Sequence, residues 1–347
     1  MRNPFIAGSW VRGENFFGRQ PLLREVLDGE RDSLWVVGAR RLGKTSLLKE
    51  LENRVQQSSQ TQWAALYWDL EGSGDTRGLA ESLLWAVEDS EHFRRATGVA
   101  VEDVEGLSVT EMLGFLVRKA VRSGWRLLLL IDEAEELLSV ARGDHGILPR
   151  LRRLFQKGTD LRTVLTATRR LARVDLQSQL LTSPFLQGFI PPLYLTPLEP
   201  EDCRQLLARG QFAGADVETI LERTARHPFL VQLIASRFFE NGDLGATLEQ
   251  VGADEMVANF FSVDFQTLEP GERAILEEVA REGPRTRGEL AAVARLSQDD
   301  VEPLLYGLRM LGYLQPEADR LKVGNAFFER WLRRSLSAGA ASGTEAS

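Results

Sequence analysis

Cysteine, histidine and long apolar runs are scarce in this chain, and each shortage excludes a class of protein. Among 347 residues there is one cysteine, Cys203, so neither an intramolecular disulfide nor a cysteine-based metal site can form. Three scattered histidines are too few to predict a zinc centre. The longest aliphatic run, residues 127–131, is too short to cross a bilayer, and the first ten residues lack the apolar core of a signal peptide. We therefore expect a cytoplasmic protein without membrane contact.

Positive charge is also in deficit. The chain carries 42 Lys and Arg against 50 Asp and Glu, which gives a net charge of −8. That balance argues against a nucleic-acid surface over the whole chain, although it does not exclude a local basic patch. The length is sufficient for two or three domains with cores of their own.

The most specific motif is the octapeptide Gly38–Thr45, which reads Gly-Ala-Arg-Arg-Leu-Gly-Lys-Thr and fits G-x-x-x-x-G-K-[ST]. An apolar run, residues 33–37, precedes it, and a helical pattern, residues 46–52, follows it. A chain of this length should contain the bare pattern by chance only about once in a hundred times. The surrounding strand and helix make a phosphate-binding loop the preferred interpretation.

Each specified position of this motif has a chemical role. Gly38 and Gly43 let the backbone turn so that successive N–H groups face one hollow. Lys44 would neutralise the β- and γ-phosphates, and the hydroxyl of Thr45 would ligate Mg²⁺. The alternative is a glycine-rich turn in an α/β domain whose phosphate site has decayed.

A second element predicts hydrolysis as well as binding. Residues 126–131 form a short aliphatic run that ends in Asp132 and Glu133, as a buried parallel strand does at its ligand-binding end. Asp132 would hold Mg²⁺ through water, and Glu133 would orient and deprotonate the attacking water. Glu135 and Glu136 are interpreted as a solvated first helical turn without a role.

The first half of the chain alternates between strand-like and helix-like patterns. Further strands are expected at residues 63–70, 161–168 and 192–196, with helices at 79–87 and 109–121. This order predicts an α/β fold with a doubly wound, parallel five-stranded sheet. Arg169 follows one strand directly, and it would either reach the γ-phosphate or lie on the surface.

The second half predicts helices up to about residue 262, the last of them at residues 246–259. Residues 264–335 then read as three helices and a β-hairpin, the order of a winged helix. The predicted parts of the chain are an N-terminal arm (1–30), a P-loop ATPase domain (31–197), a helical lid (198–262), a winged-helix domain (263–335) and a disordered tail (336–347).

Taken together, these landmarks resemble the STAND class of P-loop ATPases, which is related to the origin-recognition type of AAA+ proteins. The resemblance covers about residues 3–335. It is carried by Phe16-Phe17-Gly18-Arg19-Gln20, by the Arg40-Arg41 pair of the phosphate loop, by Leu165-Thr-Ala-Thr-Arg169 and by His227-Pro228. Two positions depart from the family pattern, since Gln20 replaces an acid and Arg226 stands where a glycine is usual.

The resemblance implies roles for residues that spacing alone does not assign. Arg169 would read the γ-phosphate as the first sensor, and His227 of the lid would contact the nucleotide. The full implied nucleotide-binding set is Arg19, Gly38, Arg40, Arg41, Leu42, Gly43, Lys44, Thr45, Ser46, His227 and Pro228. ATP in place of GTP is implied by the resemblance only, as is a slow switch between ADP-bound and ATP-bound states, often with oligomerisation.

Two other functional classes compete with the switch ATPase. A winged helix could bind DNA, but residues 264–334 carry more acids than bases, and the predicted recognition helix begins with Asp299, Asp300 and Glu302. An inactive nucleotide-binding scaffold is disfavoured because Lys44 and Glu133 are both present. The sensor repeats and effector domain usual in STAND proteins are not found, so we expect a protein partner or a self-oligomer to supply them.

Overall fold

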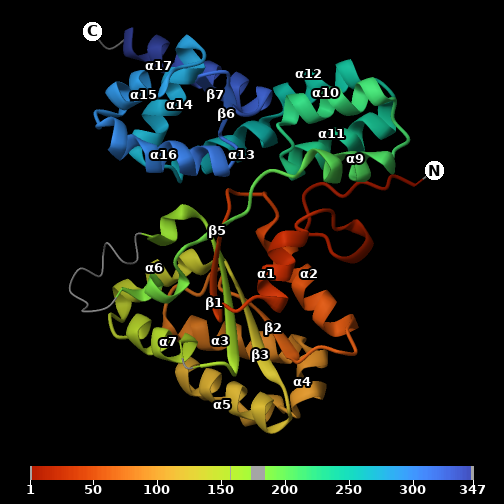
Figure 1. Cartoon of the computed structure of the whole chain (residues 1–347), viewed down its shortest axis with the longest axis vertical. Coiled ribbons are helices and arrows are strands. Elements are labelled where there is room, and N and C mark those ends of the chain that lie inside the picture. Colours follow the sequence, from red (N-terminus) through yellow and green to blue (C-terminus); the bar gives the residue numbers. More distant parts are fainter. Residues whose placement is uncertain (1, 157, 173–183, 345–347) are drawn as a thin grey trace. The chain divides into compact units, whose positions relative to one another are not determined.

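The computed structural model describes residues 2–156, 158–172 and 184–344, and these residues fall into two compact units. The sheet unit consists of Trp10–Gly38 and Gly43–Tyr194. The C-terminal unit consists of Met1–Ser9, Ala39–Leu42 and Leu195–Ser347. Each unit is described below by itself (Figure 1).

Five parallel strands form the sheet unit's core, as the sequence predicted. Their spatial order is β2-β3-β4-β1-β5, which requires helical crossovers because neighbouring strands run in the same direction. The side chains of the three inner strands are almost wholly buried, as expected for a parallel sheet covered on both faces. The strands are β1 (Ser33–Val37), β2 (Trp63–Asp69), β3 (Arg126–Asp132), β4 (Leu161–Ala167) and β5 (Leu193–Tyr194).

Strand register aligns the carboxyl ends of the strands. Val37 of β1 pairs with Ala167 of β4, and Asp69 of β2 pairs with Asp132 of β3. The loops that follow β1, β2, β3 and β4 therefore leave the sheet from the same edge.

Helices pack around this sheet (Figure 1). Side-chain caps fix several of their starts; for example, Ser108 accepts the N–H of Glu111, whose carboxylate accepts the N–H of Ser108. The helices are α1 (Gln20–Asp28), α2 (Lys44–Gln57), α3 (Thr76–Asp89), α4 (Glu91–Thr97), α5 (Val109–Arg122), α6 (Leu137–Gly143) and α7 (Ile147–Phe155).

Five helices open the C-terminal unit after Leu195. One predicted helix, residues 246–259, is two helices in the structure. Asp254 ends the first, and its carboxylate caps the second by accepting the N–H groups of Met256 and Val257. The five are α9 (Pro200–Ala208), α10 (Gly214–Thr224), α11 (Pro228–Asn241), α12 (Leu244–Ala253) and α13 (Glu255–Gln266).

Three further helices, a hairpin and a last helix complete this unit. They are α14 (Pro270–Glu282), α15 (Arg287–Ala294), α16 (Gln298–Met310), β6 (Leu314–Glu317), β7 (Arg320–Val323) and α17 (Ala326–Thr344). The hairpin is antiparallel, with Leu314 opposite Val323. Helix α17 ends at Thr344, so residues 336–344 of the segment expected to be disordered are helical, whereas residues 345–347 lie outside the described part of the chain.

The predicted N-terminal arm is divided between the two units. Its first residues belong to the C-terminal unit, where Asn3 Nδ2 donates to Glu240 Oε1 at 2.7 Å and Phe5 stacks on Phe212. Its remainder, including α1, belongs to the sheet unit. Within the described part of the chain, no helix combines the length and apolar character that a bilayer crossing requires.

Candidate functional site

The phosphate loop begins where β1 ends and closes at the first turn of α2. Gly38 N donates to Ala167 O at 3.1 Å, which ties the loop's start to the end of β4. Gly43 has φ 99°, a left-handed conformation that glycine adopts without strain, and it is the N-cap of α2. Lys44 is buried, and its Nζ donates to Gly38 O at 3.4 Å across the loop. The loop is therefore a tight turn with a buried ammonium group.

Asp132 is held from both neighbouring strands at the carboxyl end of β3. It is 1% exposed. Its Oδ2 accepts the hydroxyl of Tyr67 from β2 at 3.2 Å, while its Oδ1 accepts the hydroxyl of Thr166 from β4 and the backbone N–H of Glu133. This network fixes the orientation of the carboxylate that the sequence assigned to Mg²⁺.

Tyr67 was missed by sequence reasoning, although its position in the edge strand β2 is fixed by the sheet. Burial, followed by the carboxylates of Asp132 and Asp69, raises the pKa of Tyr67 far above its ordinary value. The phenol thus stays protonated over the working pH range and remains a hydrogen-bond donor to Asp132.

Glu133 has a strained backbone. Its φ is 49°, a left-handed conformation that costs a non-glycine residue about 1–2 kcal/mol. The residue is half-buried directly after Asp132. Strain of this kind is retained where the surrounding structure requires it, and it is consistent with a residue that must present its side chain in one direction.

Arg169 starts a short 3₁₀ segment, Arg169–Ala172, two residues beyond the end of β4. The neighbouring Thr168 donates its N–H to the carboxylate of Glu135, at 3.3 Å and 3.4 Å to the two oxygens. Glu135 was assigned no role from sequence, but it links the segment after β3 to the segment after β4. Burial, then Glu135 and Glu71, raise the pKa of Glu136, a half-buried side chain.

Arg19 and Ser46 occupy the N-terminal ends of two helices. Arg19 is the N-cap of α1 with φ 65°, and the following Gln20 accepts a hydrogen bond from Arg54 of α2 at 3.1 Å. Ser46 Oγ accepts the N–H of Val11 at 3.1 Å. The segment Phe16-Phe17-Gly18-Arg19-Gln20 is thus tied to the helix that follows the phosphate loop.

The middle of the phosphate loop, Ala39–Leu42, belongs to the C-terminal unit. Arg40 N donates to Oδ1 of Asp264 in α13 at 3.2 Å. Oδ2 of the same carboxylate accepts the hydroxyl of Tyr313, just before β6, at 2.6 Å. Asp264 is buried, and no sequence pattern singled it out.

Arg41 and His227 meet the same phenylalanine in the C-terminal unit. The Arg41 guanidinium lies 4.4 Å from the ring centre of Phe229 and 5.7 Å from that of Phe260. The ring of His227, the N-cap of α11 before Pro228, contacts Phe260 edge-on at 5.8 Å. Arg41 and His227 therefore share Phe260 as a neighbour.

Arg226 takes the backbone conformation that explains why a glycine is usual there. Its φ is 61°, and its guanidinium donates to Leu198 O at 3.0 Å. The hydrogen bond offsets part of the strain that an arginine incurs in this conformation.

The donor chemistry at the strand edge fits Mg²⁺. Asp132 and Thr45 offer carboxylate and hydroxyl oxygens, which are the ligands this hard cation takes alongside phosphate oxygens and water. The residues predicted for hydrolysis, Lys44, Thr45, Asp132 and Glu133, all lie in the sheet unit.

Comparison with known proteins agrees with this geometry. Residues 27–174 match the sequence model of a family described as an AAA domain. No curated protein matches the chain in sequence. The matched segment, which contains the phosphate loop and strands β1–β4, is thus similar to AAA domains.

One of the solved structures compared has a similar fold over almost the whole chain. A Walker-type ATPase of Pyrococcus abyssi is 19% identical with a TM-score of 0.68, covering 93% of this chain and 98% of that protein. The Aeropyrum pernix ORC2 protein, in ADPNP-ADP complexes, is 16% identical with a TM-score of 0.47, covering 94% and 97%. The Aeropyrum pernix ORC1 protein in complex with DNA is 17% identical with a TM-score of 0.41, covering 92% and 91%. TM-scores below 0.5 are too low for the last two to bear on fold or function.

Proposed function

We propose that this chain is a STAND-type switch ATPase that binds ATP with Mg²⁺, hydrolyses it slowly, and changes conformation or assembly between its ADP and ATP states. One observation carries the proposal. Within the C-terminal unit, the loop segment Ala39–Leu42 is already bonded, because Arg40 N donates to Asp264 of α13 at 3.2 Å. A carboxylate that accepts an N–H group of the phosphate loop would compete with the phosphates of a nucleotide for that group.

The roles in hydrolysis follow from the residues at the carboxyl ends of the parallel strands. Lys44 would neutralise the β- and γ-phosphates. Asp132, oriented by Tyr67 and Thr166, would hold Mg²⁺ together with Thr45. Glu133 would orient the attacking water and accept its proton, while Arg169 would stabilise charge on the γ-phosphate.

The switching role rests on Asp264. The backbone N–H groups of a phosphate loop bind the anion. The N–H group of Arg40 already donates a hydrogen bond to the carboxylate of Asp264. A carboxylate at this loop also repels phosphate, and the repulsion is greater for ATP than for ADP because ATP carries more negative charge. ATP binding would therefore favour a state in which Asp264 and Tyr313 have left the loop.

Replacing Asp264 with alanine is expected to raise ATP affinity about fivefold or more relative to ADP affinity, because the competing carboxylate is gone. Replacing Tyr313 with phenylalanine removes one hydrogen bond that holds Asp264, so a smaller change in the same direction is expected. Calorimetric titration of both nucleotides in the presence of Mg²⁺ measures the ratio.

Asp254→Ala is the matched control for this experiment. Asp254 lies at the start of the same helix, caps it and pairs with Arg237, but it belongs to none of the loop contacts. Its replacement should lower the melting temperature without changing the ATP-to-ADP affinity ratio. An unchanged ratio in Asp264→Ala, or an equal change in Asp254→Ala, would contradict the switch.

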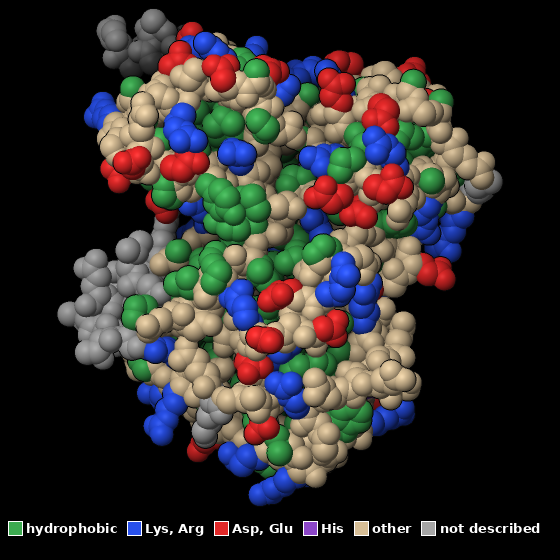
Figure 2. Space-filling model, in the orientation of Figure 1, with side chains coloured by type: hydrophobic (Ala, Val, Ile, Leu, Met, Phe, Trp, Pro, Cys, Tyr) green, Lys and Arg blue, Asp and Glu red, His purple; other side chains and the backbone are tan. Residues whose placement is uncertain are grey.

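DNA binding through the last helices and hairpin is the disfavoured alternative. We interpret α14–α16 with β6 and β7 as a winged helix, whose third helix begins with two exposed acids, Asp299 and Asp300. Arg287 is already paired with Glu302 at 3.0 Å. On the face drawn in Figure 2, acidic and basic side chains are interspersed, with no broad basic patch.

The full chain is therefore expected to bind duplex DNA only weakly, with a dissociation constant no tighter than about 10⁻⁶ M at physiological salt. Fluorescence anisotropy with labelled random and AT-rich duplexes, repeated at two salt concentrations, checks this. Sub-micromolar, sequence-dependent binding at physiological salt would favour a DNA regulator instead. A protein partner or a second copy of the chain remains our proposal for the source of signal and output.

A further inference from the structure

The N-terminal segment is bonded to a different helix at each of its ends. Its residues up to Ser9 belong to the C-terminal unit, and the sheet unit begins at Trp10. The first part contacts α11 (Figure 1), whereas the part after Trp10 contacts α2, the helix that follows the phosphate loop. The family match begins at residue 27 and therefore assigns this segment no role.

One face of α11 binds the start of the segment. Gln232, Ser236 and Glu240 are spaced four residues apart, so they lie along one side of the helix. Asn3 Nδ2 donates to Ser236 Oγ at 2.9 Å and to Glu240 Oε1 at 2.7 Å. Ile6 N donates to Gln232 Oε1 at 3.0 Å. The helix therefore recognises both a side chain and the backbone of the segment.

Phe5 adds an apolar anchor between these polar contacts. Only 6% of its surface is exposed. Its ring stacks on Phe212 with 5.6 Å between the ring centres, and it meets Phe239 edge-on at 6.2 Å. Pro4 fixes its own φ and keeps the residue before it extended, so little conformational freedom is lost when the segment docks. The docked part is thus a short, preorganised peptide with a polar and an aromatic anchor.

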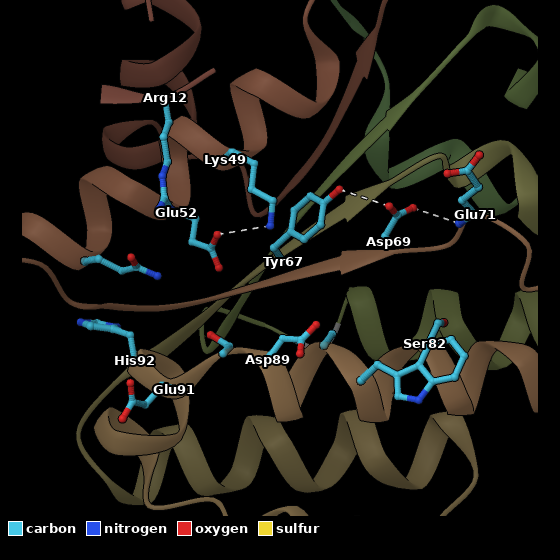
Figure 3. A pocket seen from close by; sticks show the side chains of 14 residues that line it. Arg12, Lys49, Glu52, Tyr67, Asp69, Glu71, Ser82, Asp89, Glu91 and His92 are labelled. Carbon is cyan, nitrogen blue, oxygen red and sulfur yellow. Dashed lines mark hydrogen bonds and ion pairs between the residues drawn. The ribbon is translucent and has the colours of Figure 1, made fainter. Parts of the chain in front are cut away.

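The other end of the segment is bonded to α2. Val11 N donates to Ser46 Oγ at 3.1 Å, and Gly13 N donates to Glu50 Oε2 at 2.7 Å. Arg12, between these two anchors, lines a cavity beside the same helix (Figure 3). Ser46 lies in the first turn of α2, directly after the phosphate loop.

The chain between the two sets of anchors is short and exposed. Ala7–Ser9 are exposed, and Gly8, with φ 89°, has open space where a side chain would be. Val11 is five positions after Ile6, and an extended chain spans at most about 3.5 Å per position. While both ends are docked, these two residues are therefore no further apart than about 17 Å. Because the contacts at each end lie within one unit, this limit holds for any arrangement of the two units.

A second attachment of this kind restricts what another connection allows. The chain passes from the sheet unit into the C-terminal unit at Tyr194–Leu195, and a single connection would let the units rotate about it. Any motion that takes α11 away from α2 must either stop at the reach of the N-terminal segment or break the contacts of Asn3 and Phe5.

We propose that residues 3–13 form a strap that limits the separation of α11 from α2, and that the face of α11 is the surface from which the strap detaches. Detachment permits larger separations, since a terminal segment held by few contacts opens before the fold as a whole does. One consequence rests on the proposed function. The docked strap favours ADP over ATP, because it opposes the motion that takes Asp264 away from the phosphate loop.

Pulsed electron paramagnetic resonance on the nucleotide-free full chain tests the limit. Spin labels are placed at Ser59→Cys, after α2, and at Glu222→Cys, in α10, because both positions are exposed whereas the native Cys203 is buried. A six-residue Gly-Ser insertion after Gly8 keeps both sets of anchors but slackens the strap. The longest populated distances should increase by about 5 Å or more. Phe5→Ala, which removes the aromatic anchor, should have the same effect.

The same insertion after Gly106 is the matched control. Gly106 is also an exposed glycine with a left-handed backbone, φ 76°, and open space around it, but it lies before α5 and outside the strap. Its insertion variant should leave the distances unchanged. Hydrogen exchange at the Ile6 amide reports docking, because this N–H donates to Gln232. Exchange should be slower by about tenfold or more in the unmodified chain and in the Gly8 insertion than in Phe5→Ala.

Distances that do not respond to the Gly8 insertion would overturn the strap and leave the contact with α11 as a stabilising one only. Unprotected exchange at Ile6 in the unmodified chain would overturn it as well. Calorimetric titration then measures the consequence for nucleotides: Phe5→Ala and the Gly8 insertion should each raise the ATP-to-ADP affinity ratio by about twofold or more. Distances that respond while no variant binds nucleotide would reject the proposed function and leave the strap standing.

Discussion

Replacing Glu133 with glutamine is expected to slow ATP hydrolysis by about 10²-fold or more while ATP still binds. Glutamine keeps the size of the side chain and can still orient a water molecule, but it cannot accept the proton that the water must lose. The left-handed backbone at this position, φ 49°, is retained because the substitution leaves the main chain unchanged. Phosphate release in a single turnover measures the chemical step, and calorimetry measures the binding.

Glu136→Gln is the control for this substitution. Glu136 lies three residues further along the same segment and is, like Glu133, half-buried. Its replacement should leave hydrolysis within about threefold of the unmodified chain, since most substitutions away from the reacting groups act weakly. If Glu136→Gln loses hydrolysis and Glu133→Gln does not, the base has been assigned to the wrong residue.

The sheet was predictable because local sequence determines it. Residues 126–131 and 161–168 are short, aliphatic and bounded by turns, and such runs have one favourable environment, the interior of a parallel sheet. The turn after β1 was predictable for a related reason, since Gly43 adopts a left-handed backbone, φ 99°, that glycine takes without strain.

The partners of the site residues were not predictable, because each joins segments far apart in sequence. Tyr67, Thr166 and Asp132 come from three strands whose order in space is not their order in the chain. Asp264 reaches the loop from a helix more than two hundred residues away. A tyrosine or aspartate inside an amphipathic pattern carries no local sign of such a contact.

One helix boundary was predicted wrongly, because the helical spacing of apolar residues continues across it. Residues 246–259 have continuous helical spacing, yet Asp254 ends one helix and caps the next. A carboxylate that accepts two N–H groups stabilises a new helix start by about 1 kcal/mol, which is enough to override the apolar period.

Replacing Lys44 with alanine is expected to lower nucleotide affinity by roughly tenfold to a hundredfold or more. The ammonium group is buried at the loop, so an ion pair with phosphate there would be only weakly screened by water. Without Lys44, the phosphate charge would lose this pair, and little water could take its place. The loss should be greater for ATP than for AMP, because AMP carries no β- or γ-phosphate for Lys44 to neutralise. Calorimetric titration with ATP, ADP and AMP in the presence of Mg²⁺ measures this order.

Lys119→Ala separates the charge effect from a structural one. Lys119 lies in the same unit, and its Nζ donates to the backbone oxygen of Gly98 at 3.1 Å, as Lys44 Nζ donates to Gly38 O. Its removal therefore deletes a comparable lysine–carbonyl hydrogen bond away from the phosphate loop. Nucleotide affinity should be unchanged in this variant, and both variants should melt within a few degrees of the unmodified chain. Tight, Mg²⁺-dependent ATP binding by Lys44→Ala would show that Gly38–Thr45 is a turn whose phosphate site has decayed.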